Sequence, residues 1–267
     1  MIVGVPFIGL LGVSAVIAYA YGRLGIPATP PPLQTTQVVD AEGRSLGSFH
    51  AAIDRTVIPF ADMPKHLRDA VLAAEDSGFY DHAGIDPIAI VRAAIVDIRS
   101  GTAAQGGSTI TQQLVKNVYA GHYETDPETG ERVYVPPSRT VVQKVREALL
   151  AVKLEQELSK NQILARYLNT IYFGHGAYGV QAAAQTYWQK DASKLTVLQA
   201  ATLAAAIQSP SRFDPVDNPA DARVRRNWVL DRMVATDALD AAEAEDLKAR
   251  RVKTDPIPDG ELYPPTL

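Results

Sequence analysis

The longest uninterrupted apolar pattern in the chain lies at its start. Residues 1–22 contain no Asp, Glu, Lys or Arg, and most of them are apolar. A run of this length can cross the hydrocarbon core of a membrane as a helix. Tyr19 and Tyr21, followed by Arg23, are typical of the interfacial end of such a helix. The pattern predicts a single-pass transmembrane anchor over residues 1–22.

A cleaved signal peptide is the alternative interpretation of this segment. Ala18-Tyr19-Ala20 resembles a small-residue cleavage site. The apolar run is longer than an ordinary signal-peptide core, however, and no basic residue precedes it, which favours the anchor. The next residues include Pro30, Pro31 and Pro32, which cannot continue a helix. We therefore expect residues 23–35 to form a stiff linker that leaves the membrane.

The remainder of the chain follows a mainly helical pattern. Residues 36–47 are an exception and predict two short strands around an Asp-Ala-Glu-Gly turn. From residue 64 onwards, apolar positions recur at helical spacing and capping residues mark several helix starts. The expected helices cover residues 64–75, 86–101, 109 through the 110s, 140–158, the segments after the capping boxes at Ser159 and Thr196, and 220–251.

Two polar stretches interrupt or end this pattern. Residues 120–138 are rich in turn-forming residues and predict a mobile loop. Residues 251–267 are rich in proline and predict a linker that has been cut short. Between the linker after the anchor and this proline-rich end, residues 36–250 are expected to form a single mainly α domain. Residues 200–207 are small and apolar, so this helix is expected to be buried.

Composition narrows the function only slightly. The chain has no cysteine, which excludes disulfides, thiolate metal sites and a cysteine nucleophile. Its net charge of −4 argues against a general nucleic-acid-binding protein. The five histidines are scattered and show no metal-binding spacing, and we expect His82 to hold a turn by hydrogen bonds.

Glu75 and Asp76 are the first candidates for chemistry. They follow an apolar helical segment and precede Phe79 and Tyr80. A carboxylate in such surroundings can lose part of its hydration and act as a general base. A solvated acidic helix end is the plainer interpretation, and the composition alone does not decide between them.

A glycine-rich stretch that opens a helix is the second candidate. Gly106 and Gly107 lead into Ser108 and Thr109, and two glutamines and a lysine follow on the same helix, namely Gln112, Gln113 and Lys116. Backbone N–H groups at a helix start suit an oxyanion or a phosphate. The stretch lacks the pattern of a nucleotide-binding P-loop. Taken alone, it would more often be an ordinary capped loop.

A charged helix face is the third candidate. Lys144 and Glu147 are three residues apart and share a face, while Arg146 projects about 100° away from Glu147. Arg139 lies just before this helix. A carboxylate among cations stays ionised and can orient a substrate or a cation. The alternative is a solvated charged face with no function.

Together, these motifs resemble those of one family, the family-51 peptidoglycan glycosyltransferases, which include the transglycosylase domain of class A penicillin-binding proteins. The first three family motifs match Glu75-Asp76-x-x-Phe79-x-x-His82-x-Gly84, the run from Gly106 to Asn117, and Lys144-x-x-Glu147. The later ones match Ile163-Leu164-x-x-Tyr167-Leu168-Asn169-x-Ile171-Tyr172-Phe173-Gly174 and the alanine-rich segment before Ser209-Pro210-Ser211. The resemblance covers about residues 34–235 and, since the motifs keep the family's order, it favours the functional interpretation of each candidate.

The resemblance implies a lysozyme-like, two-lobed helical fold with a small membrane-proximal jaw, on the outer side of a bacterial plasma membrane. It implies that Glu75 is the general base, supported by Asp76, and that the substrates are lipid II and the nascent lipid-linked glycan. It also implies a set of residues around the donor pyrophosphate: Arg92, Ser108, Thr109, Gln112, Gln113, Lys116, Arg139, Lys144 and Arg146. Glu147 would position these cations or a divalent cation (Mg²⁺ or Mn²⁺), although the motifs require no cofactor.

The chain departs from the family pattern at one motif position. The arginine that usually precedes the lysine of the third motif is Gln143 here. A lytic hydrolase and a non-catalytic membrane scaffold are the alternative functions. A hydrolase of neutral glycan has no pyrophosphate to hold, and the presence of Glu75, Lys116 and Glu147 argues against a scaffold. No Ser-x-x-Lys occurs, so this chain carries no transpeptidase site of that type. The abrupt tail and the strand-like residues 36–47 resemble the bifunctional members of the family, so we expect this chain to be the glycosyltransferase part of a longer class A penicillin-binding protein, with cell-wall synthesis machinery as partners.

Overall fold

The structure is a computed structural model that describes residues 21–26, 36–39, 45–49, 55–90, 107–119, 122–125, 132–135 and 140–256, with backbone only in the four strands. Within these ranges, no helix is long and apolar enough to cross a bilayer. Nearly all of the expected anchor over residues 1–22 lies outside the described residues. The anchor therefore stays a prediction.

The described part of the chain is mainly helical, as the apolar spacing predicts. Its helices are α2 (Lys65–Glu75), α4 (Ile110–Val118), α5 (Val141–Glu157), α6 (Lys160–Leu168), α7 (Val180–Trp188), α8 (Val197–Ile207), α9 (Pro219–Ala235) and α10 (Ala241–Ala249), with short 3-10 turns at Phe60–Asp62 and Ala192–Lys194. Two antiparallel hairpins pair β1 (Thr36–Val39) with β2 (Ser45–Phe49), and β3 (His122–Thr125) with β4 (Arg132–Val135).

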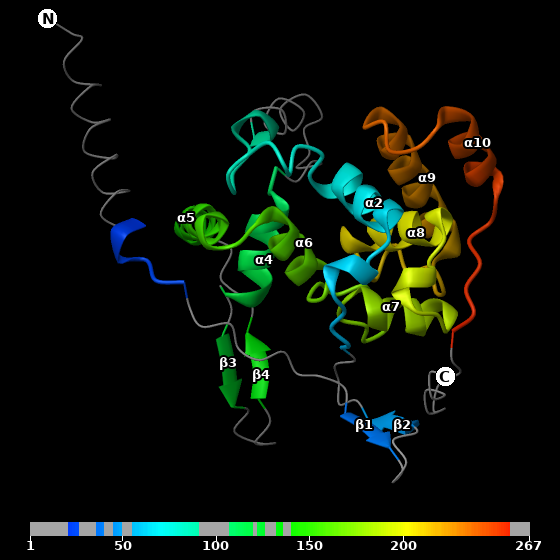
Figure 1. Ribbon diagram of the computed structural model, residues 1–267, viewed down its shortest axis with the longest axis horizontal. Helices are drawn as coiled ribbons and strands as arrows, with labels where there is room; N and C mark the ends of the chain where they lie inside the picture. The colour runs from blue at the N-terminus through cyan, green and yellow to red at the C-terminus, as the bar shows by residue number, and fades with distance from the viewer. Residues whose placement is uncertain are drawn as a thin grey trace, which may run out of the picture.

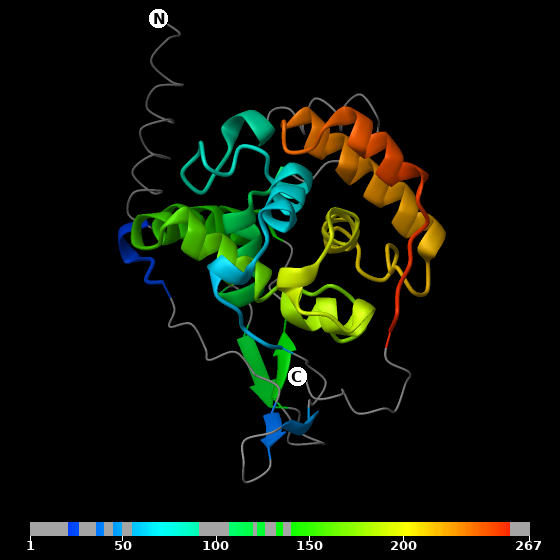
Figure 2. The same cartoon turned by 45° about the vertical axis from the view of Figure 1, so that its right-hand side comes forward.

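The helices form two groups (Figure 1). Helices α4, α5 and α6 lie on one side, and α2 with α7 to α10 lies on the other. Figure 2 shows the same division after rotation, with α9 and α10 side by side at the edge of the molecule. Both hairpins lie on the face opposite α10.

Helix α8 is at the centre of the second group. Its residues from Ala200 to Ala206 are all buried, and it packs against both α2 and α9. Small side chains allow this close approach, because alanine lets neighbouring helices come near without leaving gaps. The prediction of a buried small-residue helix is confirmed. By fixing α2, α8 also fixes Glu75, the last residue of α2.

Local capping explains where several helices begin. Thr109, Ser159 and Thr196 each form a capping box with a glutamine three residues later, at the starts of α4, α6 and α8. The capping boxes predicted at Ser159 and Thr196 are thus confirmed. Asp86 accepts hydrogen bonds from the backbone N–H groups of Ile88 and Ala89, which confirms it as the cap of the helical residues 87–90.

The structure corrects two local predictions and adds one helix. The stretch expected to be a loop, residues 120–138, contains β3 and β4, which pair with His122 opposite Val135. Val133-Tyr134-Val135 is a β-forming run that the abundance of turn residues obscured. Pro64 is the N-cap of α2 and not its first helical residue. Helix α7 was not predicted.

The end of the described chain folds back onto α7. The indole N–H of Trp188 donates to the carbonyl of Lys253 at 2.7 Å. The backbone N–H of Asp255 donates to the carbonyl of Tyr187 at 2.9 Å. Residues 251–256 thereby pack on the domain.

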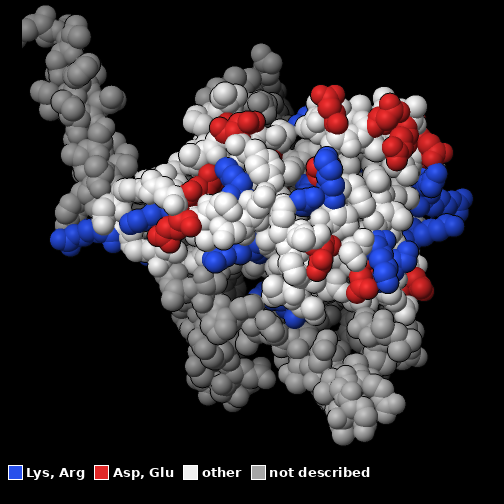
Figure 3. Space-filling view, viewed as in Figure 1, with Lys and Arg blue, Asp and Glu red and all other residues white. Residues whose placement is uncertain are grey.

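The surface in Figure 3 carries charges of both signs. Acidic side chains gather over α9 and α10, where Glu243, Glu245 and Asp246 are exposed (Figure 3).

Candidate active site

The cavity that contains Glu75 has a volume of about 510 Å³ and is bounded by both groups of helices. Its lining includes ends or faces of α2, α4, α5 and α8 and the segment between α6 and α7. The residues that line it are Arg55, Glu75, Ser108, Gln112, Gln113, Lys116, Asn117, Lys144, Glu147, Thr170, Ile171, Tyr172, Tyr178, Ile207, Gln208 and Pro210.

Glu75 presents a partly desolvated carboxylate to this cavity. Burial raises its pKa above the ordinary value of 4.5. The side-chain amide of Gln113 donates to its Oε2 at 2.8 Å, and this hydrogen bond opposes the rise in pKa. The positive charge of Arg225 also opposes it, whereas the neighbouring Asp76 adds to it. A carboxylate whose pKa is raised in this way suits general base catalysis.

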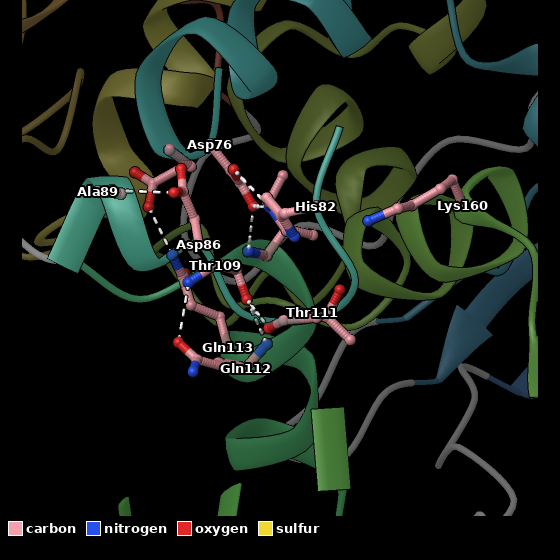
Figure 4. Close-up of polar contacts among 12 residues, drawn as sticks. Asp76, His82, Asp86, Ala89, Thr109, Thr111, Gln112, Gln113 and Lys160 are labelled. Carbon is pink, nitrogen blue, oxygen red and sulfur yellow. Dashed lines mark hydrogen bonds and ion pairs between the residues drawn. The ribbon is translucent and has the colours of Figure 1, made fainter. Parts of the chain in front are cut away.

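Asp76 does not line the cavity but holds the loop behind it (Figure 4). Its carboxylate accepts hydrogen bonds from the ring of His82 at 3.0 Å and from the backbone N–H of Ile110, the first residue of α4, also at 3.0 Å. Asp76 therefore joins the end of α2 to the start of α4. His82 holds this turn by hydrogen bonds, as the sequence predicts.

Of the candidate residues at and near the start of α4, some hold the fold together and others line the cavity. Thr109 is buried, and its hydroxyl donates to the carbonyl of Gly84 at 2.7 Å. Gln112 completes the capping box and also touches the cavity. Ser108, Gln113 and Lys116 line the cavity directly. Of the predicted residues on this segment, Thr109 alone is placed away from the cavity.

Helix α5 supplies another part of the lining. Lys144 and Glu147 both line the cavity, as their spacing on one helix face predicts. Gln143, which replaces the usual arginine, donates through its amide to Glu147 at 3.3 Å. Arg146 is exposed and does not line the cavity. Arg92 and Arg139 lie outside the described residues.

Sequence reasoning missed an aromatic and cationic wall formed by residues far apart in the chain. The Arg55 guanidinium lies 5.5 Å from the centre of the Tyr178 ring, and Arg55 donates to the carbonyl of Thr170. Tyr172 and Tyr178 pack ring against ring with centroids 4.8 Å apart. Tyr172 belongs to a family motif and could have been selected from it. Arg55 and Tyr178 carried no comparable signal.

A second cluster of ligand-type side chains lies outside the cavity. His175, Asp214 and Asp217 place a nitrogen and two carboxylate oxygens within 4.8 Å of one another. Asp214 is engaged within the protein, because it accepts hydrogen bonds from the Tyr187 hydroxyl and from the backbone N–H groups of Val216 and Asp217. The cluster therefore has a structural explanation as the turn that precedes α9.

The cavity combines a carboxylate with cations. Glu75, Lys116 and Lys144 all line it, together with the hydroxyl of Ser108 and the amide of Gln113. A base can remove a proton from an attacking hydroxyl, and nearby cations stabilise an anionic leaving group. A helical domain with such a cavity is suited to an enzyme that transfers a group to a hydroxyl.

Comparison with known proteins defines the family. A family model described as Transglycosylase matches residues 42–234. Penicillin-binding protein 1A of Aquifex aeolicus is 44% identical over 212 residues, which cover 77% of this chain and 26% of that protein. Penicillin-binding protein 1A of Escherichia coli is 40% identical over 198 residues, covering 74% and 21%. The chain belongs to the transglycosylase family, the peptidoglycan glycosyltransferase domain of class A penicillin-binding proteins.

The relatives are much longer than this chain. Penicillin-binding protein 1F of Bacillus subtilis is 36% identical over 216 residues, covering 81% of this chain and 28% of that protein. The chain thus spans about a quarter of the length of the curated relatives it matches. A crystal structure of penicillin-binding protein 1A from Haemophilus influenzae aligns with a TM-score of 0.47 and 23% identity, covering 86% of this chain and 22% of that chain.

Proposed function

We propose that this domain polymerises the glycan chains of peptidoglycan from lipid-linked precursors. The acceptor would be lipid II, and the donor would be the growing lipid-linked glycan. The observation that carries the proposal is the placement of Glu75 and two lysines, Lys116 and Lys144, on one cavity. This arrangement matches a reaction in which a hydroxyl attacks and a pyrophosphate leaves.

In the proposed reaction, Glu75 removes the proton from the 4-hydroxyl of lipid II. The oxygen then attacks the anomeric carbon of the donor glycan and forms the new glycosidic bond. The bond from that carbon to undecaprenyl pyrophosphate breaks, with inversion at the carbon. The raised pKa of Glu75 supports this role, because a base whose pKa approaches the working pH transfers protons more effectively.

The leaving pyrophosphate would lie along α4 and the face of α5. Ser108, Lys116 and Lys144 line this part of the cavity and can donate to phosphate oxygens. Two cations that meet an oxyanion as its charge develops lower the barrier more than they stabilise the bound substrate. Arg92, Arg139 and Arg146 are proposed to extend this site on the family resemblance alone.

A divalent cation is an optional part of the proposal. Glu147 supplies a carboxylate in the cavity, and Mg²⁺ is commonly held by one or two carboxylates together with substrate phosphates. The residues present therefore fit Mg²⁺ or Mn²⁺ once a pyrophosphate is bound. Such an ion would neutralise charge on the leaving group. The neighbouring Lys144 can serve the same purpose without metal.

The family resemblance also supports a location and a shape for the whole protein. We propose a single-pass anchor in the bacterial plasma membrane, with the catalytic domain outside the cytoplasm in a lysozyme-like, two-lobed form with a membrane-proximal jaw. Both substrates are lipid-linked, so anchoring the enzyme would raise their effective concentration. Cell-wall synthesis machinery is the proposed partner class, and nucleic acid is not.

Polymerisation of labelled lipid II in detergent tests the proposal. We expect wild-type protein to form polymer that moenomycin blocks, and Glu75→Gln to lose activity by about a hundredfold or more, since a general base contributes about 10²–10⁴-fold. The exposed Glu157 on α5 offers a matched control, and Glu157→Gln should polymerise normally.

The other outcomes separate the alternatives. If the wild type formed no polymer but cleaved finished glycan, the domain would be a lytic hydrolase. If it did neither, a scaffold role would replace the proposed enzyme. If Glu75→Gln polymerised as well as the wild type, the reaction would stand and Glu75 would not be its base.

A further inference from the structure

A buried tyrosine stands behind the amide that contacts Glu75. The hydroxyl of Tyr167 donates to Oε1 of Gln113 at 2.8 Å, and Nε2 of the same amide donates to Glu75 at 2.8 Å. Tyr167 lies on α6, Gln113 on α4 and Glu75 on α2. Tyr167 is fully buried and does not line the cavity. Three helices are therefore linked by one hydrogen-bonded relay that ends at the proposed base.

Chemistry fixes the direction of this relay. An ionised carboxylate can only accept hydrogen bonds, so Gln113 must turn its NH₂ group towards Glu75. Its carbonyl oxygen then faces Tyr167, which must donate. Burial and the nearby carboxylates of Glu75 and Asp76 raise the pKa of Tyr167 well above its usual range, so the phenol keeps its proton. The donor needed at this position is therefore always present.

The opposite orientation of the Gln113 amide would instead stabilise Glu75 in its protonated form. If Gln113 were flipped, its carbonyl oxygen would face Glu75 and could accept a hydrogen bond only from a carboxylic acid. The NH₂ group would then need an acceptor on the other side. The Tyr167 oxygen could accept from that NH₂ group, but its own buried O–H would then lose the Gln113 oxygen as its acceptor, and this loss disfavours the flipped arrangement. The tyrosine thus acts on Glu75 without touching it.

We propose that Tyr167 is a positioning residue that locks the orientation of the Gln113 amide and thereby holds Glu75 in its ionised, proton-accepting form. The inference rests on the proposed function only in assigning catalytic value to that form. It also gives Gln113 a role towards the base in addition to any contact with a pyrophosphate.

Other groups also act on the charge of Glu75 and must be held constant in any test. Helix α9 contributes the charge of Arg225, and Asp76 follows Glu75 directly in the chain. The remaining charged groups that line the same cavity are Arg55, Lys116, Lys144 and Glu147. Replacing Tyr167 with phenylalanine changes none of these charges and keeps the aromatic ring.

The test measures the titration of Glu75 directly and through activity. Protein labelled with ¹³C at glutamate carboxyls is titrated by NMR, with Glu75→Gln identifying the signal, and the rate of lipid II polymerisation is measured across the same pH range. In Tyr167→Phe, we expect both midpoints to move to higher pH. At a pH below the wild-type midpoint, the rate relative to its plateau should fall about three- to tenfold, the effect of losing about one hydrogen bond.

Two further variants identify the route of the effect. Gln113→Leu should move the midpoint in the same direction, and adding Tyr167→Phe to it should change nothing more, because the tyrosine acts through the amide. Tyr187→Phe is the matched control. Tyr187 is also a buried tyrosine, but its hydroxyl bonds Phe173 and Asp214, so the Glu75 midpoint should stay unchanged.

An unchanged NMR midpoint in Tyr167→Phe would overturn the inference. An equal shift of the midpoint with and without Gln113 would also overturn it, by showing a packing effect. If Tyr167→Phe did not fold, Gln113→Leu alone would decide. An unchanged midpoint of the Glu75 signal in that variant would contradict the inferred relay. If the NMR midpoint moved and the activity profile did not, the relay would stand and the proposed role of Glu75 as base would fail.

Discussion

At the residue scale, the structure explains how one carboxylate of an ordinary helix end differs from its neighbour. Glu75 and Asp76 are adjacent, and burial raises the pKa of both. The backbone N–H of Ile110 and the ring of His82 lower the pKa of Asp76 and so oppose the effect of burial. Their hydrogen bonds also fix the Asp76 side chain in place. Glu75 accepts one amide hydrogen bond and faces the cavity. The fixed carboxylate organises the loop, and the cavity-facing one is available for proton transfer.

The raised pKa of Glu75 has a consequence for stability. The folded protein binds this proton more tightly than the unfolded chain does, so stability falls as pH rises from about 4.5 through the raised value. The penalty is fully present above that value. Glu75→Gln removes the buried charge and keeps an acceptor for Gln113. We expect its melting temperature to exceed that of the wild type at pH 7, by about 2–4 °C for each 1 kcal/mol recovered.

Thermal melts followed by circular dichroism from pH 4 to pH 8 check this prediction. The difference between Glu75→Gln and the wild type should grow with pH and vanish at the acid end. Glu157→Gln, at an exposed site on α5, should show no such trend. A melting temperature that fell at pH 7 in Glu75→Gln would show that the carboxylate stabilises the fold.

At the scale of elements, one glycine sets the distance between the loop after α2 and helix α5. Gly84 has a φ of 83°, in the region that favours glycine. A side-chain carbon there would lie 2.7 Å from backbone atoms of Ala151 and Val152 on α5. The Gly84 carbonyl also accepts the Thr109 hydroxyl bond at the start of α4. This contact brings α2, α4 and α5 together around the cavity.

We predict that Gly84→Ala destabilises the protein by about 2–5 kcal/mol, the sum of a left-handed backbone and a steric clash. Gly176→Ala is the matched control, because Gly176 also has a positive φ but nothing lies within 4 Å of the place that an added side-chain carbon would take. It should cost only about 1–2 kcal/mol. Urea unfolding measures both. Equal losses would mean that α5 yields to the added methyl group.

At the scale of the whole molecule, helix α9 affects Glu75 although it contributes no residue to the cavity lining. It packs against α2, and its Arg232 donates to the carbonyl of Ala73 at 3.3 Å, near the end of that helix. Arg225 lies two turns earlier on α9, and its guanidinium lies 3.7 Å from the centre of the Trp228 ring. Its charge lowers the pKa of Glu75. A helix that does not line the cavity thus helps to set its chemistry.

We predict that Arg225→Met raises the pKa of Glu75 further and moves the acid limb of the polymerisation profile to higher pH. Activity should therefore fall more at acid pH than on the plateau. Arg223→Met removes the same charge from α9, but Arg223 is exposed and bonds carbonyls at the end of α10. Its profile should match the wild type. An identical shift in both variants would indicate a general loss of positive charge.

Features that depend on neighbours along the chain follow from the sequence alone. The helical spacing, the caps at Ser159 and Thr196 and the shared face of Lys144 and Glu147 are local properties, and the structure confirms them. Glu75 became a candidate for the same reason, since an apolar helix leads to it, but only the family resemblance favoured it over a solvated helix end. The hairpin at residues 122–135 was missed because its strands are short and surrounded by turn residues.

Which groups meet depends on the tertiary structure. Gln113 reaches Glu75 across 38 positions of sequence, and Tyr167 reaches Gln113 across 54. Helix periodicity indicates which face of a helix is buried but not which side chain of another helix faces it. The pKa of Glu75 depends on that pairing and on the charge of Arg225. Hydrogen bonding and desolvation act through space, so the assembled helices, and not the order of the residues, set the chemistry of the cavity.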